Sequence, residues 1–307
     1  MSRPDTIAIV NERAGAGAMA DVFRRLEHDL EAIVGPFDVA FTDYAGHAIA
    51  LAREALLDGY TRILVGGGDG TVNEVVNGWF DADGQPLAEG ARLALITGGT
   101  GGDFRKTVGA RTREDALRLL EQDRVVPTDV GRVTYHSHDG EEETRYFMNI
   151  ASFGLSGETD RHIPSFKRFG GKLAYAGATL RALWGWKNPV VRLTLDGAPG
   201  PTGPMCTVAV ANGRYFGGGM MVCPTAELDD GRFTVGILGD LSRFEVVRQT
   251  RTIYDGSHVK SPKVTMHPAR TVVAESDTPV YLDVDGEALG LLPARFDLLP
   301  AALPLVR

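Results

Sequence analysis

The sequence predicts two domains, an amino-terminal α/β domain with a parallel sheet and a carboxyl-terminal all-β domain that forms an antiparallel sandwich. In the first 130 residues, short apolar runs alternate with stretches of helical apolar spacing, a pattern that favours parallel strands joined by helices. After residue 130, short strand-like runs are separated by glycine turns, as in antiparallel sandwiches. One amino-terminal run leads directly into three consecutive glycines, where a parallel sheet binds ligands.

The composition describes a globular chain and restricts its partners. With 307 residues, 43% of them apolar, the chain is long enough for two domains that each bury a core. No apolar run reaches the ~18–20 residues of a membrane span, and the first residues lack the apolar segment of a signal peptide. Cys206 and Cys223 suggest neither a disulfide framework nor a four-ligand zinc site. A formal charge of −8 argues against nucleic acid as a partner. We therefore expect a cytoplasmic protein.

The amino-terminal elements follow one another at the spacing of a parallel sheet. We expect strands at residues 6–10, 37–41, 63–65 and 93–96, and helices that reach about residue 33, then span 46–57, 72–79 and 113–121. A second glycine loop follows the strand at 93–96. Both glycine loops should therefore lie at the carboxyl edge of the sheet.

Residues 63–77 have the pattern of a strand, a tight loop and a helix start. The β-branched run is followed by three glycines, then by Asp69-Gly-Thr and an apolar spacing suited to a helix. Glycines let backbone N–H groups approach a ligand, and a helix start adds unpaired donors and the positive end of the dipole. A phosphate suits such a loop. The alternative is a glycine-rich turn capped by Asp69 or Thr71; we favour a nucleotide-phosphate site.

Asp69 is unexpected in this loop, because it puts a carboxylate where an anion should bind. Such a group could hold a divalent cation, orient the phosphates through water, or help to remove a proton. The loop also lacks the Gly-Lys-Ser/Thr ending of a Walker A motif and the six-residue dinucleotide fingerprint. Those two nucleotide-binding motifs are therefore disfavoured.

From residue 131 we expect short antiparallel strands. They are the runs at 131–136, 144–150, 190–195, 205–211, 233–238, 263–269, 271–276 and 280–284. Because the sequence changes character at about 125–130, we place the domain boundary near residue 130.

Four motifs in this order resemble the diacylglycerol kinase catalytic domain family. They are Gly-Gly-Asp-Gly-Thr at 67–71 with its Val-Asn-Glu-Val helix start, the second glycine loop at 97–104, the Asn-Gly…Gly-Gly-Gly-Met…Leu-Asp-Asp-Gly string at 212–231, and Asp-Gly-Glu at 285–287. The family includes bacterial lipid kinases, sphingosine kinases and ceramide kinases, and is a structural relative of NAD kinases. The resemblance implies an NAD-kinase-like fold. Residues 1–130 would form the nucleotide-binding catalytic domain, 131–295 the lipid-substrate sandwich, and 296–307 a terminal segment that returns to the first domain.

The resemblance implies a set of nucleotide contacts on the loops of the first domain. These residues are Asn11, Thr42, Gly66, Gly67, Gly68, Asp69, Gly70, Thr71, Val72 and Thr100. In the second glycine loop the family has Asn where this chain has Gly102. A contact from that side chain is therefore not expected here, and Thr100 and Asp103 are the positions carried over.

In the second domain the resemblance implies a magnesium site. Its ligands would be the side chain of Asp230 with the backbone carbonyls of Glu227 and Arg232. Carboxylate and carbonyl oxygens are the donors that hard cations take. Whether the ion is structural or catalytic stays open.

The resemblance also implies a catalytic carboxylate at the Asp-Gly-Glu motif, which in isolation could be only a hairpin turn. Glu287 would be the base that accepts the proton of the lipid hydroxyl, because a hydroxyl is a poor nucleophile until its proton is taken up. Asp285 would orient it or bind metal through water. Asp69 competes for the role of base, as in the sphingosine kinase relatives.

Residues 161–187 combine basic and aromatic side chains and contain no acidic one. The side chains are Arg161, Lys167, Arg168, Lys172, Arg181 and Lys187, interleaved with Phe166, Phe169, Trp184 and Trp186. This composition is typical of a helix at a lipid interface. An ordinary amphipathic helix whose aromatic residues belong to the core is the alternative.

Taken with the resemblance, the sequence predicts a cytoplasmic kinase of lipid metabolism, including phospholipid biosynthesis, that associates peripherally with a membrane. It would transfer the γ-phosphoryl group of ATP, with Mg²⁺, to the hydroxyl of diacylglycerol or a sphingoid-type lipid. ATP would lie between the domains. The alternatives are an NAD kinase-like small-molecule kinase and a non-catalytic lipid-binding regulatory module. A homodimer is compatible with the sequence but is not specified by it.

Overall fold

The structure is a computed structural model that describes residues 3–15, 17–96, 102–169 and 171–307, and the side chains of these residues other than 167–172. Contacts divide the chain into two compact units. Unit 1 contains Met1–Thr128 and Ala301–Arg307, and unit 2 contains Asp129–Pro300. The sequence prediction places the boundary after residue 130 and begins the terminal segment at residue 296.

Unit 1 is built on parallel strands. They are β1 (Thr6–Val10), β2 (Asp38–Phe41), β3 (Arg62–Gly66) and β4 (Arg92–Ile96). The order is β2-β1-β3-β4, and the end of the last strand of the chain pairs with β4 at Leu305 and Leu93. The short apolar runs of the sequence form these strands because both of their faces are covered by helices.

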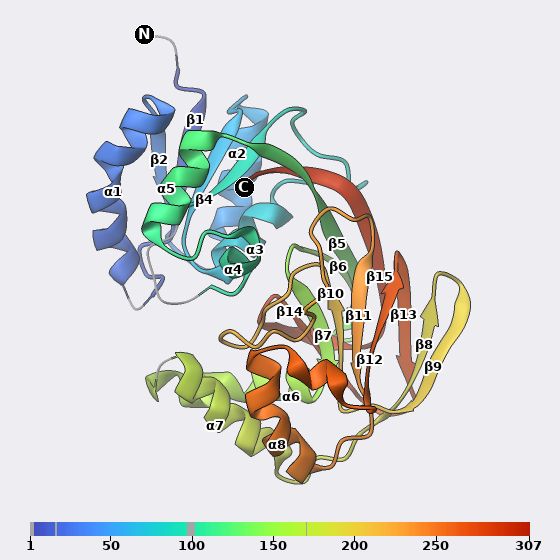
Figure 1. Ribbon diagram of the computed structural model, residues 1–307. Coiled ribbons are helices and arrows are strands. Elements are labelled where there is room, and N and C mark those ends of the chain that lie inside the picture. Colours follow the sequence, from blue (N-terminus) through green and yellow to red (C-terminus); the bar gives the residue numbers. More distant parts are fainter. Residues whose placement is uncertain (1–2, 16, 97–101, 170) are drawn as a thin grey trace. The chain divides into compact units, whose positions relative to one another are not determined.

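The helices of unit 1 follow the strands in alternation. They are α1 (Ala18–Val34), α2 (His47–Leu57), α3 (Asp69–Asn77), α4 (Phe104–Val108) and α5 (Arg113–Gln122). Phe23 and Leu26 of α1 pack with Leu120 of α5 on Ala8 and Leu64 of the sheet, and Figure 1 shows α1 and α5 side by side. Side chains alternate between the faces of a strand, so Ile7 and Ile63 point to the opposite face, toward α2 and α3.

Helix α3 begins at Asp69, earlier than the predicted start at Val72. The reason lies in the glycine turn. A Cβ on Gly67 would come within 2.4 Å of the Thr71 hydroxyl oxygen, so the chain turns into the helix immediately. Only glycine permits so close an approach of backbone to side chain.

Unit 2 is dominated by antiparallel strands. They are β5 (Val125–Ser137), β6 (Glu142–Phe147), β7 (Ile150–Gly154), β8 (Val190–Leu195), β9 (Ala198–Pro204), β10 (Thr207–Ala211), β11 (Phe233–Leu238), β12 (Val264–Ala269), β13 (Thr271–Ser276), β14 (Tyr281–Val284) and β15 (Glu287–Val306). The central order is β12-β11-β10-β7-β14-β15, and β13 links β15 to β8. The predicted fold class, an α/β domain followed by an antiparallel β domain, is confirmed.

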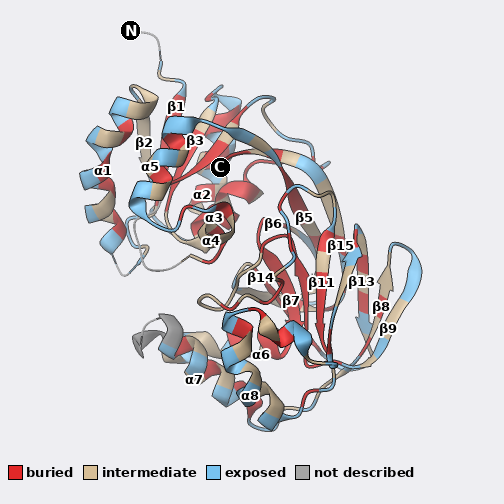
Figure 2. Ribbon diagram, in the orientation of Figure 1, coloured by how far each residue is buried: buried red, intermediate tan, exposed pale blue. Residues whose placement is uncertain are grey.

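The core of unit 2 lies between its strands, where the ribbon is mostly buried (Figure 2). The ring of Phe147 stacks on that of Phe233 with centroids 5.7 Å apart, and Phe153 stacks on Phe296 at 6.1 Å. Offset aromatic stacks of this kind add to the free energy gained from burying apolar area.

Unit 2 also contains helices, which Figure 1 shows grouped together near one end of its strands. They are α6 (Leu155–His162), η1 (Ile163–Phe169), α7 (Gly171–Leu183), α8 (Arg243–Tyr254) and η2 (Ser257–Lys260). The sequence predicts helix within 161–187 but does not predict α8. Helix α8 begins with a capping box, in which Ser242 and Glu245 satisfy each other's backbone N–H groups.

Strand β15 is 20 residues long and runs from unit 2 into unit 1. The sequence predicts only a terminal segment from residue 296, and the glycine- and proline-rich β9 is missed as well. Prolines lower the strand signal because they donate no ladder hydrogen bond.

Candidate functional site

The loops of unit 1 that carry the predicted nucleotide contacts begin at one edge of its sheet. In register, Val10 pairs with Phe41 and with Gly66, and Gly66 pairs with Ile96. All four strands are parallel, so the loops that follow them leave the same edge. In open α/β sheets, this carboxyl edge is where ligands bind.

The first glycine loop opens α3. The first intrahelical hydrogen bond runs from Val72 N to Gly68 O at 3.1 Å, so the N–H groups of Asp69, Gly70 and Thr71 precede the helical ladder. A small cavity of about 100 Å³ lies against Gly67 and Gly68, and its other lining residues come from α1, α3, α4, β3, β4 and the loops of unit 1. An N-terminal turn of a helix beside open space is suited to a phosphate.

Asn11 and Thr42 both lie at this edge, directly after β1 and β2. Asn11 N donates to Gly66 O at 2.7 Å, and Asn11 Nδ2 donates to the Thr71 hydroxyl at 3.2 Å. Asn11 therefore ties the loop after β1 to the start of α3. The Thr42 N–H donates to Val10 O at 3.0 Å, which holds the end of β2 beside β1.

Asp69 contacts the described end of the second glycine loop, at residues 103 and 104. Its Oδ2 accepts a hydrogen bond from Asp103 N at 2.6 Å, and its Oδ1 accepts one from Phe104 N at 3.2 Å. Lys106 Nζ pairs with the Asp103 carboxylate at 2.6 Å. The structure thus brings Asp69 and Asp103 together, while Thr100 lies outside the described residues.

The surroundings of Asp69 favour its protonated form more than water would. Burial raises the pKa of this carboxyl, and the nearby Asp103 carboxylate raises it further, against the two amide hydrogen bonds that lower it. Both oxygens of the Asp69 carboxyl group already accept hydrogen bonds from backbone N–H groups. Asp69 is therefore well placed to fix the second loop on the first, and less suited to taking a proton from a substrate.

Asp285 and Gly286 form the turn between β14 and β15. Both have positive φ, +50° and +91°, the conformation of a two-residue type I′ hairpin turn. The Asp285 carboxylate accepts hydrogen bonds from Met148 N, Asn149 N and Ile150 N at 3.2, 3.2 and 2.9 Å. This side chain therefore fixes the turn on the start of β7, and its role in catalysis stays a prediction.

Glu287 directly follows this turn. Its Oε2 accepts a hydrogen bond from Arg145 at 3.3 Å, and its side chain keeps 38% of its surface exposed. Compared with Asp69, Glu287 is therefore more accessible to a hydroxyl group. The contact with Arg145 of β6 holds the Glu287 side chain at the start of β15.

The predicted metal ligands lie on one turn of unit 2. Asp129 fixes this turn, because its N–H donates to Leu228 O at 2.7 Å and its carboxylate accepts from Gly231 N at 2.8 Å. The Asp230 carboxylate accepts from Arg232 N at 3.1 Å and lies 3.4 Å from the Arg232 Nε.

In donor type, the turn fits a hard cation. Asp230 with the carbonyls of Glu227 and Arg232 supplies oxygen atoms only, but the Arg232 guanidinium must leave the carboxylate for an ion to enter. Within the described residues, the structure contains no cluster of three or more His, Cys, Asp or Glu side chains of the kind that binds a metal. The magnesium site stays a prediction.

An apolar cavity of about 290 Å³ lies in unit 2 between α6, α7 and α8 and the ends of β10 and β11. Its lining includes Leu155, Tyr175, Leu183, Phe216, Met220 and Ile253. None of the described residues that line it is charged. Pockets of this size and lining accept hydrophobic ligands.

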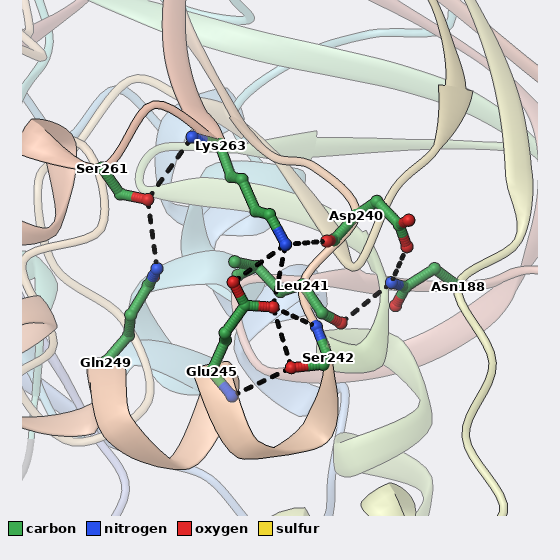
Figure 3. Close-up of polar contacts among 8 residues, drawn as sticks. All are labelled: Asn188, Asp240, Leu241, Ser242, Glu245, Gln249, Ser261 and Lys263. Atoms are coloured by element: carbon green, nitrogen blue, oxygen red, sulfur yellow. Dashed lines mark hydrogen bonds and ion pairs between the residues drawn. The ribbon is translucent and has the colours of Figure 1, made fainter.

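A polar network holds the start of α8 beside the segment that follows α7 (Figure 3). Asn188 Nδ2 donates to Asp240 Oδ1 at 2.7 Å and to Leu241 O at 2.9 Å. Lys263 Nζ donates to Glu245 and to Asp240 O, each at 2.9 Å. Hydrogen bonds from Lys263 and from the Ser242 cap lower the pKa of Glu245 to about 2, so this carboxylate stays charged throughout the physiological range.

Some of the basic and aromatic side chains of residues 161–187 contact other residues of the protein, and others are exposed. Arg161 pairs with Glu158 and stacks on Tyr281, Phe166 packs on Gly177, and Trp186 is half-buried. Trp184, by contrast, is 84% exposed. The side chains of Lys167, Arg168, Phe169 and Lys172 lie outside the described residues, so the interface prediction depends on the remainder.

Sequence reasoning missed Arg145, Asp129 and the whole of α8. A signal for α8 was present, since Ser242-Arg-Phe-Glu245 has the spacing of a capping box. No local sequence signal indicated Arg145 or Asp129, because each forms its hydrogen bond with a residue about 100 positions or more away in the sequence.

Comparisons with known proteins agree with this architecture. The diacylglycerol kinase catalytic domain model matches residues 5–133, and the YegS C-terminal NAD kinase beta sandwich-like domain model matches residues 149–307. Yeast NADH kinase complexed with NADH superposes with a TM-score of 0.50 at 12% identity, over 99% of this chain and 83% of that chain. The fold is therefore that of the NAD-kinase-like proteins, as predicted.

Relatives with similar sequences identify the family within this broader fold. The diacylglycerol kinase of Bacillus subtilis (strain 168) is 31% identical over 261 residues, which are 83% of this chain and 80% of that protein. That of Mycobacterium tuberculosis (strain ATCC 25618 / H37Rv) is 27% identical over 309 residues, 98% and 94% of the two chains. A crystal structure from Bacillus anthracis str. Sterne superposes with a TM-score of 0.76 at 26% identity, over 98% and 94%. The chain belongs to the diacylglycerol kinase family, whose members at family level are lipid kinases.

The contacts of Asp69 lead to a prediction for Asp69→Asn. An amide can accept only one of the two N–H bonds that the carboxylate accepts, so we expect a loss of about 1–3 kcal/mol in the free energy of unfolding. The amides of Asp103 and Phe104 should also exchange hydrogen faster. Chemical denaturation and amide exchange measure both effects. Asp83→Asn, at an exposed position of unit 1, is the matched control. Unchanged exchange at 103 and 104 would show that Asp69 does not hold the second loop.

Proposed function

We propose that this protein transfers the γ-phosphoryl group of ATP to the hydroxyl of a membrane lipid, diacylglycerol or a sphingoid-type lipid. Unit 1 would hold the phosphates on the glycine loop at 66–71, with Asn11 and Thr42 at the same edge. Unit 2 would hold the lipid and the base. A magnesium ion, bound by Asp230 and neighbouring carbonyls or carried in with the nucleotide, would neutralise charge on the phosphate oxygens.

The apolar cavity of unit 2 is the main observation that supports a lipid as the acceptor. Acyl chains need an apolar space, and the cavity has about 290 Å³ with no charged residue among the described residues of its lining. A dinucleotide acceptor would instead require charged or strongly polar partners for its phosphates and riboses. The cavity therefore favours a lipid over the acceptor of an NAD kinase-like enzyme.

Phosphoryl transfer requires the protein mainly to position the two substrates and to accept the proton of the acceptor hydroxyl. As the acceptor oxygen bonds to the γ-phosphorus, its proton passes to Glu287. At the same time the bond between the γ-phosphorus and the β,γ-bridging oxygen breaks, and ADP leaves. Asp285 keeps the turn before Glu287 in place through its three amide hydrogen bonds. A non-catalytic lipid-binding module would have no need for this arrangement.

For Glu287→Gln we expect kcat for lipid phosphorylation to fall by about 100-fold or more, because an amide cannot accept the proton. The KM for ATP should change little, since the nucleotide is assigned to unit 1. Steady-state kinetics with radiolabelled ATP and dispersed lipid measure both parameters. Glu141→Gln, at an exposed position of the same unit, is the control. A kcat near the wild-type value would reject Glu287 as the base and leave Asp69.

Filling the cavity should discriminate among acceptors. Ala176 of α7 lines the cavity, and Ala176→Trp places an indole in the space assigned to an acyl chain. We expect the KM for a long-chain lipid to rise at least 10-fold, with a smaller effect on a soluble short-chain analogue and none on the KM for ATP. Ala198→Trp, on exposed β9, controls for the added bulk. Equal kinetics with long-chain lipid would place the acceptor elsewhere.

The cavity also suggests how the protein would meet a membrane. Leu180 of α7 and Trp184, directly after α7, are 64% and 84% exposed; on α8, Phe244 and Val247 are 76% and 55% exposed. Leu180 and Val247 also line the cavity. Exposed basic side chains accompany them, namely Arg181, Lys187, Arg243 and Arg248. Exposed apolar side chains with basic neighbours suit an anionic lipid surface.

No helix in the described parts of the chain is long and apolar enough to cross a membrane. Peripheral binding can be tested by co-sedimentation with vesicles that contain anionic phospholipid. We expect the double variant Trp184→Glu and Phe244→Glu to bind at least 10-fold more weakly, because charges replace inserted apolar groups. Leu57→Glu alters an exposed leucine of unit 1 and should bind as the wild type does. Undiminished binding by the double variant would contradict the assigned surface.

A further inference from the structure

Two buried carboxyl groups meet beneath the Asp285–Gly286 turn. Asp160 of α6 is 8% exposed and Asp283 of β14 is 1% exposed, and their side chains are hydrogen-bonded to each other. Two carboxyl groups can share a hydrogen bond only when one of them carries a proton. Burial raises the pKa of both carboxyl groups, and their hydrogen bond raises the pKa of Asp283 further while it lowers that of Asp160, which favours a shared state with the proton on Asp283.

Asp283 connects this pair to the turn. Its Oδ1 accepts a hydrogen bond from Gly286 N at 2.9 Å, the residue immediately before Glu287. Its Oδ2 accepts one from the Ser152 hydroxyl at 3.0 Å. The Ser152 hydroxyl also lies 2.8 Å from that of Ser156. Each oxygen of Asp283 therefore has a partner, and one of those partners belongs to the catalytic turn.

Helix α6 places Asp160 rigidly. A Cβ on Gly157 would come within 2.2 Å of Tyr281 O, so α6 packs directly on the backbone of β14. Leu155, Ser156 and Thr159 of the same helix line the apolar cavity. Helix α6 therefore lies between the space assigned to the lipid and the strand that leads into the turn.

We propose that Asp160 is a positioning residue: its hydrogen bond to Asp283 holds the Asp285–Gly286 turn in the conformation that presents Glu287 to the acceptor hydroxyl. Asp160 does not line the cavity, so it acts through Asp283. The turn needs such support because Asp285 has a positive φ of +50°, a backbone conformation that residues with a side chain rarely adopt. The catalytic part of this inference rests on the proposed function, whereas the structural part does not.

The test compares Asp160→Leu with Asp160→Asn. Leucine is close in size but leaves Asp283 without its partner, whereas the side-chain amide of asparagine can still form a hydrogen bond with Asp283. For Asp160→Leu we expect kcat to fall 10- to 100-fold while the KM values for ATP and lipid change less than 3-fold. Asp160→Asn should restore most of the lost kcat. Glu158→Gln, which alters a surface ion pair of the same helix, controls for general damage to α6.

A double variant separates positioning from a merely structural role. If Asp160 acts through Glu287, then Asp160→Leu in the Glu287→Gln background should cost little further kcat, because the group it positions is already gone. Full additivity of the two losses would overturn the proposal, as would a wild-type kcat for Asp160→Leu.

Amide hydrogen exchange provides a measurement that needs no activity. We expect the Gly286 and Glu287 amides to exchange at least 10-fold faster in Asp160→Leu than in the wild type, and near the wild-type rate in Asp160→Asn. Circular dichroism and thermal unfolding verify that the variants are folded. If no lipid is phosphorylated by the wild type, the proposed function fails, yet exchange still decides whether Asp160 holds the turn. Equal protection in all three proteins would overturn the proposal.

Discussion

The candidate site depends on one kind of interaction, a half-buried or buried carboxylate that accepts hydrogen bonds from the backbone of a second loop. In unit 1, Asp69 accepts from two amides of the second glycine loop. In unit 2, Asp285 accepts from three amides at the start of β7. Hydrogen bonds to a charged group contribute about 1.5–3 kcal/mol each. Loops made of glycine and turn residues have few side chains to pack, so these bonds replace the packing that would otherwise fix them.

The same interaction explains how an acid is accommodated in a loop suited to phosphate. Asp69 puts its carboxylate against the amides at the start of α4, and the adjacent Asp103 is neutralised by Lys106. The N–H groups at the start of α3 precede the first hydrogen bond of the helix. The negative charge is thus compensated on one side of the loop while the donors that suit an anion lie on the other side.

Much of this could be predicted from the sequence, because local patterns encode it. The parallel strands, the glycine loops and the antiparallel strands each have a periodicity or a turn signal, and the Asp-Gly-Glu motif pointed to Glu287. Contacts between distant residues could not be predicted. No local pattern indicates that Arg145 meets Glu287, that Asp129 fixes the turn at Gly231, or that Asp160 meets Asp283. The start of α3 at Asp69 was also missed, because its cause is the contact of Gly67 with Thr71.

The apolar cavity was beyond sequence reasoning for a different reason. Its lining residues come from three helices and two strands, and each alone resembles an ordinary core residue. Protein interiors normally collapse onto such space, since empty volume costs free energy. Here the polar network of Asn188, Asp240 and Lys263 fixes the start of α8 beside the segment after α7 (Figure 3). Hydrogen bonds with defined directions hold these elements at a set separation, which apolar contacts alone would not. The helices can therefore remain apart around a space that a flexible acyl chain could fill.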